Sequence, residues 1–257
     1  ENAAEIMRRT LSTLGGGSFS CEMDDGTQIC VQLSVNQKSR TATVNFAGSS
    51  RQRAGNLNAP RAVCQSAVLY VFRTIVGTNI PLNDGCLEVI DIQIPEASVL
   101  APSYPAPVVA GNVETSQIIC DALFGAIGVL AASQGTMNNL TFGNEHMQYY
   151  ETICGGTGAG AKFNGADAVQ SHMTNSLMTD PEVLEQRFPV RVEDFSVRQN
   201  SGGLGHTCGG NGVTRRLRFL EPMSAAIVSN RRTTAPHGLN GGQQGELGRN
   251  QIIKVDG

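Results

Sequence analysis

The chain is poor in several features that would assign it to a functional class at once. It has no tryptophan, aromatic residues make up 5% of it, and charged residues make up 16%. Its formal net charge of −3 gives no electrostatic reason to expect nucleic acid or an anionic membrane surface as a partner. The longest apolar run, from Ile118 to Ala132, is too short to span a bilayer and contains Asp121. We therefore expect neither nucleic acid nor a membrane as a partner.

The cysteines show no disulfide framework. The seven thiols form no CxxC pair, and several lie inside apolar runs, where cysteine behaves as a small hydrophobe. The N-terminal segment is amphipathic and charged, unlike a secretory signal. These observations predict a reduced, cytoplasmic protein. Because the first residue is Glu1 rather than methionine, we also expect the chain to be a piece of a longer protein.

The order of apolar patterns predicts an α+β fold with mixed sheets and buried helices. The C-terminal third, from Val190 onward, reads mostly as short β-strands broken by glycine, asparagine and proline. We expect residues 1–257 to form a single domain fragment, and a subdivision near residues 135–150 is the alternative. The sequence contains neither an internal repeat nor a low-complexity tract.

Local signals place the first elements. A helix is expected over residues 2–14, closed by the glycines at 15–17 because glycine tolerates the left-handed C-cap conformation. Short strands are expected over residues 19–46, with Asp25-Gly26 as a hairpin turn.

Two buried helices are expected after these strands. Asn58 is the expected N-cap of the first, with a proline in its first turn. The second starts at Thr115 or Ser116, and its apolar sequence indicates burial on all sides. Gly125 and Gly128 are expected to allow close packing of this helix against another backbone.

A glycine-dense loop follows a strand-like segment in the run YYETICGGTGAGAKFNG, from Tyr149 to Gly165. The GK[ST] sequence of a phosphate-binding P-loop is absent, and an Asn-Gly turn stands where a dinucleotide-binding fold would begin a helix. We interpret the loop as the backbone-lined wall of a pocket, whose free N–H groups could hold an oxyanion. The alternative is a tight loop that only lets backbone approach backbone. The candidate substrate-binding residues of this loop are Gly156, Gly158 and Gly160.

Three polar residues stand between this loop and the start of a helix. His172, Thr174 and Asn175 are the candidate catalytic residues, because the unperturbed pKa of histidine lies near neutrality and suits general acid–base chemistry. The alternative for His172 is a buried histidine bonded to a carbonyl group. Thr179 or Asp180 is expected to cap the helix PEVLEQRF, which gives Asp180 a structural role.

A second glycine cluster, NSGGLGHTCGGNGVTRRLRF, contains Ser201, His206 and Cys208 in one loop. A nucleophile would need a base within hydrogen-bond reach in space, and the spacing shows only that three polar side chains share one loop. We therefore interpret the glycines as successive turns between strands and do not predict catalysis by Cys208. The four histidines of the chain lie far apart and form no HExxH motif, so no metal site is predicted. The pairs Arg215–Arg216 and Arg231–Arg232 are interpreted as solvated strand ends.

Several of these runs together resemble the hydantoinase B/oxoprolinase family. They include AASQGTMNNLTFGN, YYETICGGTGAGAKFNGADAV, SHMTNSLMTDPEVLEQRFPVRVEDFSVR, NSGGLGHTCGGNGVTRRLRFLEPM and NRRTTAPHGLNGGQQGELGRN, in the family's order over nearly the whole chain. The wording YYETICGG is most similar to the C-terminal (B) half of the ATP-dependent 5-oxoprolinases. By this match residues 172–175 align with the family's HMTN. Ser201, Gly202 and Gly203 align with its SGG and join the candidate substrate-binding residues.

The resemblance implies a two-part enzyme of glutathione metabolism. An actin-like ATPase half (hydantoinase A-type) would bind ATP and Mg²⁺ and phosphorylate the amide oxygen of a lactam, and the B half would help to hydrolyse the activated ring. The product from 5-oxo-L-proline would be L-glutamate. The ATPase half and the N-terminal part of the B half are absent here, so the fragment alone is expected to be inactive and to hold no cofactor. A homo-oligomer is also expected.

Two alternatives stay open at this point: a segment of a hydantoinase or acetone-carboxylase-type subunit, and a purely structural or interaction module of such an enzyme. The chain also departs from the family pattern at several positions. Leu177 stands where an arginine is common, Ala161 replaces a proline, and Cys208 lies where a basic or aromatic pair is usual. The missing arginine weakens the expectation of carboxylate or phosphate binding beside HMTN.

Overall fold

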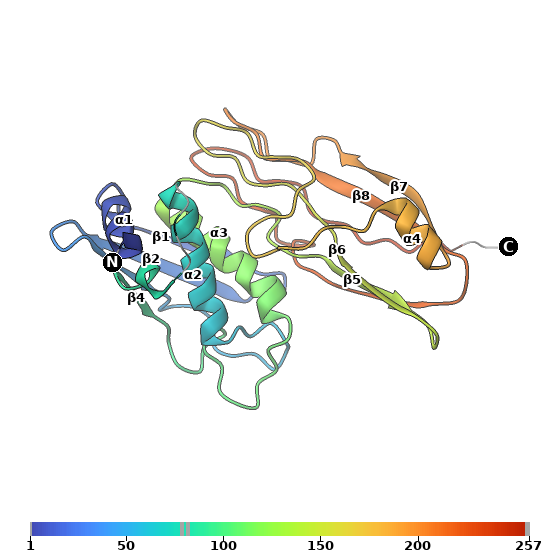
Figure 1. Ribbon diagram of the computed structural model, residues 1–257, viewed down its shortest axis with the longest axis horizontal. Helices are drawn as coiled ribbons and strands as arrows, with labels where there is room; N and C mark the ends of the chain where they lie inside the picture. The colour runs from blue at the N-terminus through green and yellow to red at the C-terminus, as the bar shows by residue number, and fades with distance from the viewer. Residues whose placement is uncertain (1, 78–79, 81–82, 255–257) are drawn as a thin grey trace.

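The computed structural model describes residues 2–77, 80 and 83–254, and Figure 1 shows two regions along the long axis of the molecule. We call residues 2–137 the N-terminal region and residues 138–254 the C-terminal region. Helices packed on a sheet form the first, and short strands with long loops form the second. The predicted α+β class, with its strand-rich C-terminal third, is confirmed.

A four-stranded sheet of order β1-β2-β3-β4 organises the N-terminal region. Its strands are β1 (Gly17–Glu22), β2 (Gln28–Asn36), β3 (Thr41–Asn45) and β4 (Ile90–Gln93). The first three pair antiparallel, as the predicted hairpin requires, and β4 runs parallel to β3. Alternate residues of β2, such as Ile29 and Val31, are buried, because successive side chains of a strand point to opposite faces.

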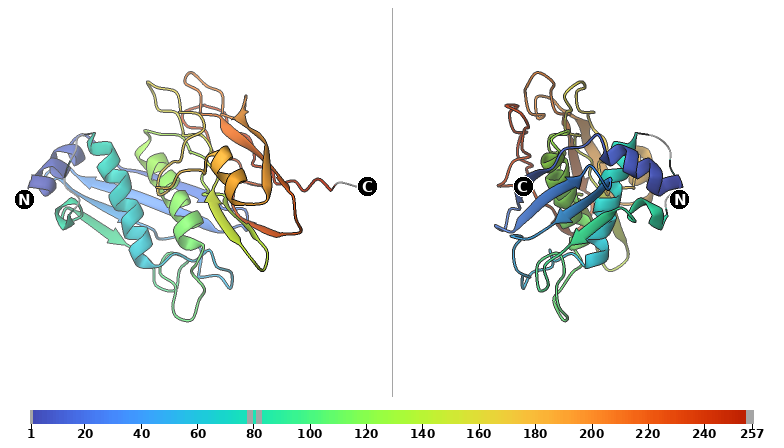
Figure 2. Two further views of the ribbon diagram at one scale, coloured as in Figure 1. Left: turned by 45° about the vertical axis from the view of Figure 1, so that its right-hand side comes forward. Right: turned by 90° about the vertical axis from the view of Figure 1, so that its left-hand side faces the viewer.

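Three helices cover one face of this sheet: α1 (Asn2–Leu11), α2 (Arg61–Val76) and α3 (Ser116–Ile127). Figure 2 shows α2 and α3 lying side by side across the strands. Every residue of α3 from Ser116 to Ala126 is buried, which agrees with a helix that is apolar on all sides. A short 3₁₀ helix η1 (Asp84–Cys86) precedes β4, and a π-helical turn η2 (Gly111–Thr115) leads into α3. Within the described residues, no helix combines the length and the apolar character needed to cross a membrane.

Two glycine predictions are wrong. The helix α1 ends at Leu11, and none of the glycines at 15–17 has a positive φ, so they form no left-handed C-cap. Gly17 instead lets β1 approach α3, because a Cβ there would overlap the carbonyl oxygen of Ala126. Gly128 does not serve close packing, since its position is open; its φ of +80° ends α3 in the left-handed conformation. Gly125 does pack closely, against the ring of Phe19.

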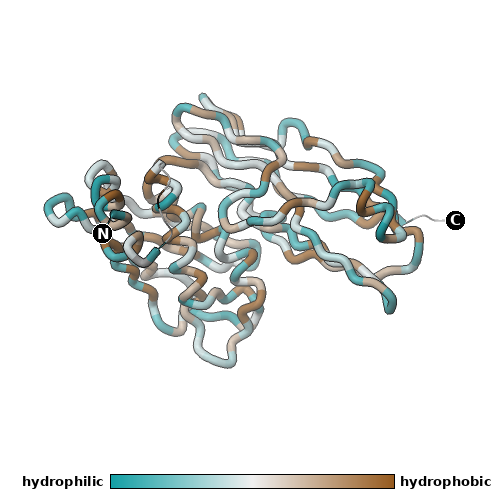
Figure 3. The backbone as a smooth tube through the Cα atoms, viewed as in Figure 1, coloured by the Kyte–Doolittle hydropathy of each residue, from teal (hydrophilic) through white to brown (hydrophobic). Residues whose placement is uncertain are grey.

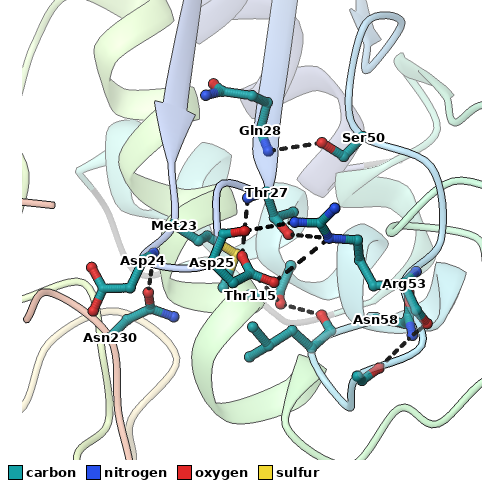
Figure 4. Close-up of polar contacts among 12 residues, drawn as sticks. Met23, Asp24, Asp25, Thr27, Gln28, Ser50, Arg53, Asn58, Thr115 and Asn230 are labelled. Atoms are coloured by element: carbon teal, nitrogen blue, oxygen red, sulfur yellow. Dashed lines mark hydrogen bonds and ion pairs between the residues drawn. The ribbon is translucent and has the colours of Figure 1, made fainter. Parts of the chain in front are cut away.

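The predicted cap of α2 is also wrong. Pro60 occupies the N-cap position without a side-chain bond, and Asn58 is buried two residues earlier. The Asn58 amide donates to the carbonyl oxygens of Arg53, Gly55 and Pro107 and accepts from the Arg53 N–H. Figure 4 shows Asn58 beside Arg53. Asn58 therefore holds a loop in place.

The C-terminal region contains a three-stranded sheet and a hairpin. The sheet has the order β6-β5-β9, from β5 (Asn139–Gly143), β6 (Gln148–Thr152) and β9 (Ser224–Val228). The hairpin pairs β7 (Val190–Arg198) with β8 (Gly212–Phe219). The helix α4 (Pro181–Arg187) begins after Asp180, whose carboxylate accepts the N–H groups of Glu182 and Val183, as the predicted cap requires.

Apolar side chains are distributed differently in the two regions. The main core is formed by residues between Ala3 and Ala126, whereas the C-terminal cluster has only Phe142, Leu184 and Val190 fully inside. Along the C-terminal strands and loops, hydrophobic and hydrophilic residues alternate over short distances (Figure 3). This region therefore depends less on a packed core.

Candidate active site

A cavity of about 1350 Å³ lies between the C-terminal region and the last segment of the N-terminal region. Four segments form most of its wall. They are the residues after α3 (128–138), the glycine loop after β6 (153–161), the loop between β7 and β8 with β8 itself (201–219), and the C-terminal segment (231–253). This volume is more than enough for a small polar molecule. The cavity is thus the candidate binding site.

Most of the candidate substrate-binding glycines lie at this cavity. Its wall contains Gly156, Gly160, Gly202 and Gly203, together with Ser201. Their second role is to let loops pack together, because a Cβ on Gly156 would overlap the backbone of Gly210 and one on Gly202 that of Gly209. The structure therefore combines both interpretations of the glycine loops. The backbones of the two glycine loops pack directly against each other, and together these loops form a wall of the cavity.

Gly158 is the exception among these candidates. It does not line the cavity, and its N–H donates to the hydroxyl of Ser133 at 3.0 Å. A Cβ at this position would overlap the carbonyl oxygen of Ala131. Its contacts are therefore those of a packing residue that fastens the glycine loop to the segment after α3.

The hydroxyl of Ser201 is occupied within its own loop. It donates to the carbonyl oxygen of Arg198 at 2.7 Å and accepts the N–H of Gly212 at 2.8 Å. The carboxamide of Asn211 accepts the N–H groups of Ser201 and Gly202. Ser201 thus holds the wall of the cavity in shape, with a hydroxyl committed to backbone partners.

The three candidate catalytic residues do not converge on the cavity. The imidazole of His172 is 3% exposed and lies behind the wall, against Phe124 with ring centroids 5.4 Å apart. Thr174 is buried and its hydroxyl accepts the side-chain amide of Gln117 at 2.9 Å. Asn175 is exposed. The first two therefore fasten the HMTN segment to α3, and the third faces outward.

His172 belongs to a buried ion cluster that sequence reasoning missed. Its Nε2 lies 3.0 Å from Oδ1 of Asp121, and its Nδ1 lies 3.4 Å from the hydroxyl of Tyr70. The other carboxylate oxygen of Asp121 accepts from the Arg231 guanidinium at 3.0 Å, and Oδ1 also accepts the N–H of Ser133. Since a carboxylate only accepts, Nε2 of His172 is the donor.

Charge within this cluster keeps Asp121 ionised. Burial alone would raise the pKa of the carboxyl, but the hydrogen bond and charge of His172 and the charge of Arg231 outweigh burial and lower it. Arg231 is itself 3% exposed and lines the cavity, and Gly135 makes room for its guanidinium, which a Cβ there would overlap. The HMTN segment thus reaches the cavity indirectly, through Asp121 and Arg231. The sequence signal was a single aspartate inside an otherwise apolar helix.

One imidazole that does line the cavity is that of His237. It packs on Phe19 with ring centroids 4.4 Å apart, and its Nδ1 lies 3.8 Å from the thiol of Cys21. Burial lowers the pKa of His237 and raises the pKa of Cys21 to about 12, so both groups are neutral near pH 7. His206 also lines the cavity, whereas Cys208 does not and Leu177 is 90% exposed.

The β1–β2 turn fixes the segment that carries these cavity residues. The Asp24 N–H donates to the carboxamide of Asn230 at 2.9 Å (Figure 4). The Asp24 carboxylate accepts the N–H groups of Arg232, Thr233 and Thr234. Arg231 and Arg232 are therefore not solvated strand ends, as their sequence suggested; they stand at a cavity wall anchored from the N-terminal region.

Comparison with protein families and comparison with curated proteins identify the same family. The family model described as hydantoinase B/oxoprolinase matches residues 1–256. A 5-oxoprolinase of Dictyostelium discoideum is 49% identical over 235 residues, which cover 91% of this chain and 19% of that protein. The chain therefore spans about a fifth of the length of this curated relative.

Two solved structures share the fold. Acetone carboxylase in its nucleotide-free state superposes with a TM-score of 0.81 at 17% identity, covering 96% of this chain and 38% of that one. The ATP-dependent caprolactamase from Pseudomonas jessenii gives a TM-score of 0.75 at 22% identity, covering 88% of this chain and 43% of that one. At these identities the likeness shows the fold alone.

Proposed function

Because the chain belongs to the hydantoinase B/oxoprolinase family, we propose that it is part of an ATP-dependent hydrolase that opens the ring of 5-oxo-L-proline. The observation that carries this proposal is the cavity walled by glycine loops, which belong to sequence runs that resemble the family. A hollow with backbone and a few polar side chains on its wall is a common setting for a small polar substrate.

The chemistry explains why such an enzyme needs two parts. A lactam resists attack by water because resonance with nitrogen makes its carbonyl carbon a poor electrophile. Phosphorylation of the amide oxygen by ATP activates that carbon, water then adds to it, the ring C–N bond breaks and the nitrogen takes a proton. A second water releases phosphate and leaves L-glutamate. In this scheme the present chain binds and orients the activated ring.

We assign ATP and Mg²⁺ to an ATPase-type region of the longer protein, which is the expected partner of this chain. The glycine loop here has no GK[ST] sequence, and the described residues contain no group of three or more His, Cys, Asp or Glu side chains able to hold a metal ion. The reduced state expected of its thiols favours a cytoplasmic location, and the homo-oligomer stays a prediction.

The candidate residues have different parts in this proposal. The cavity-lining set acts by backbone contacts with the substrate and comprises Gly156, Gly160, Ser201, Gly202 and Gly203. His172 serves as a positioning residue, since its imidazole reaches the cavity wall only through Asp121. Thr174 and Gly158 hold the loops in place, and the exposed Asn175 is available to a neighbouring part of the longer protein.

The test is an assay of the full-length protein that contains this chain. With 5-oxo-L-proline and ATP we expect glutamate and ADP to form in equal amounts, measured by chromatography. The same preparation is then given hydantoin, or acetone with bicarbonate, in place of 5-oxo-L-proline. Carboxylation of the ketone without glutamate formation would instead identify a carboxylase subunit. A scaffold role would be indicated if folded variants of the cavity wall kept full turnover.

A further inference from the structure

Arg232 is a half-buried cation at the cavity wall without an acidic partner. Its Nη1 donates to the carbonyl oxygen of Asn230 at 2.6 Å, and its Nη2 donates to the carboxamide oxygens of Asn138 at 2.7 Å and Asn250 at 3.1 Å. All three acceptors are neutral. Its neighbour Arg231, by contrast, forms an ion pair with Asp121, and Arg232 has no such pair among the described residues.

Two carboxyl groups, Asp24 and Glu114, act on this charge, and neither forms an ion pair with it among the described residues. Asp24 is engaged by the three backbone N–H groups of residues 232–234. Glu114 is fully buried, and burial raises its pKa to about 8, so it is mostly protonated near pH 7. Burial lowers the pKa of Arg232 more than Glu114 and Asp24 raise it, which agrees with a cation short of counter-charge. A buried charge without a partner is costly unless a ligand supplies one.

The guanidinium of Arg232 is also fixed in place. The backbone N–H of Arg232 donates to the Asp24 carboxylate at 2.7 Å. Gly248 leaves room for the guanidinium, because a Cβ at that position would overlap Nη1. Three of its five N–H groups meet protein oxygens, and Nε is buried without a partner. This is a pre-organised cation at a cavity wall, and the second N–H of its Nη1 has no protein acceptor among the described residues.

We propose that Arg232 binds the carboxylate of a small-molecule substrate in this cavity and selects anionic lactams over neutral ones. The proposal rests on the function proposed above and names the group that recognises its substrate. The ring and its activated amide would then lie toward the glycine loops.

The test compares 5-oxo-L-proline with 5-oxo-L-prolinamide, in which an uncharged carboxamide replaces the carboxylate, in the full-length protein. The wild type should prefer the acid. Arg232→Gln should lower kcat/KM for the acid by about tenfold to a hundredfold, mainly through KM, because a charge-assisted hydrogen bond is lost. The same variant should change kcat/KM for the amide by less than about threefold. Arg232→Lys, which keeps the charge, should retain part of the preference.

Arg249→Gln is the matched control, because it removes a positive charge from an exposed side chain on the same cavity rim. It should change kcat/KM for both lactams by less than about threefold. Equal losses on the two lactams for Arg232→Gln would show a structural role and overturn the proposal. If that variant does not fold, the wild type still decides, since equal use of acid and amide contradicts a carboxylate site.

The proposed function and the role of Arg232 are tested by different results. Turnover of neither lactam by the wild type would reject the 5-oxoprolinase assignment. Calorimetric titration with the acid and the amide then tests Arg232 alone: binding of the acid only supports the anion site. Equal binding of both, or of neither, overturns it.

Discussion

The N-terminal and C-terminal regions are stabilised in different ways. In the first, three helices and a sheet bury a continuous apolar core that includes Phe72 and Leu123 with no exposure. In the second, few apolar side chains are fully buried, and polar contacts are more prominent, such as the carboxamide of Asn211 and the buried ion pair of Glu151 with Arg215. Backbone contacts between glycine loops add to these.

This difference in packing explains why the cavity lies among the loops and not inside the apolar core of the N-terminal region. A close-packed apolar core leaves no space for a ligand, whereas loops held by hydrogen bonds can enclose one. The helix α3, through Asp121, and the Asp24 turn bond to the C-terminal region, so the packed N-terminal region supports the cavity wall. Four predictions test this comparison, each through the stability of the 257-residue chain and one also through the turnover of the full-length protein.

The largest effect is expected from a matched pair of leucines. Leu123→Ala in α3 should lower the free energy of unfolding by about 3–5 kcal/mol, because it leaves a cavity in a packed core. Leu140→Ala in β5 should cost about 1 kcal/mol, since that side chain is partly exposed at the cavity. Urea unfolding measures both. Equal losses would show that the C-terminal region has a core as tight as that of the N-terminal region.

The second prediction concerns the charges of the C-terminal region. The side chains of Arg215 and Glu151 are 2% and 1% exposed, with a shortest N···O distance of 3.3 Å. Arg215→Ala should destabilise the chain by about 3 kcal/mol, because it leaves a buried carboxylate unpaired. The control is Arg218→Ala on the same strand, whose pair with Glu193 is partly exposed, and it should cost less than about 1 kcal/mol. Thermal melts compare the two variants, and similar losses would contradict a polar-stabilised region.

Local patterns allowed several elements in both regions to be predicted. The strands of β2 and β3, the burial of α3 and the cap at Asp180 follow from the spacing of residues close together in the chain. Asn58 shows the limit of this reasoning. An asparagine just before a proline and an apolar run has the pattern of an N-cap, yet one of its partners is the carbonyl oxygen of Pro107, far along the chain.

At the candidate site, even more of the contacts join residues that are far apart in the chain and could not be predicted from local patterns. The HMTN motif drew attention to His172, but the motif does not reveal that its partners are Asp121 and, beyond it, Arg231, which are distant in sequence. Gly158 and Gly160 look alike in the glycine loop, yet only the second lines the cavity. Contacts of this kind depend on how whole segments pack, which local spacing does not encode.

The third prediction separates positioning from acid–base chemistry at His172. His172→Ala should cost about 2 kcal/mol, because Asp121 loses a hydrogen bond in a buried site. His172→Gln should recover much of this stability, since its amide can donate to the same carboxylate. In the full-length protein the glutamine variant should also keep most of the turnover and an unchanged pH profile. If the Gln variant is as inactive as the Ala variant and an ionisation disappears from the profile, His172 is an acid–base group.

The smallest effect is expected at the turn that joins the two regions. Asp24 is partly exposed; burial alone would raise its pKa, but the N–H groups of residues 232–234 outweigh this and lower it. Asp24→Asn should therefore lower the free energy of unfolding by about 1 kcal/mol at pH 7, allowing for solvent screening. A depressed pKa stabilises the folded state above the unfolded value, near 3.9, and this contribution is lost as the pH falls through the folded value. Urea unfolding from pH 7 to pH 3 should show the difference between wild type and variant shrinking only below about pH 4. A difference that stays constant over this range would mean that the charge of Asp24 does not hold the cavity segment, and that the shape of the turn alone joins the two regions.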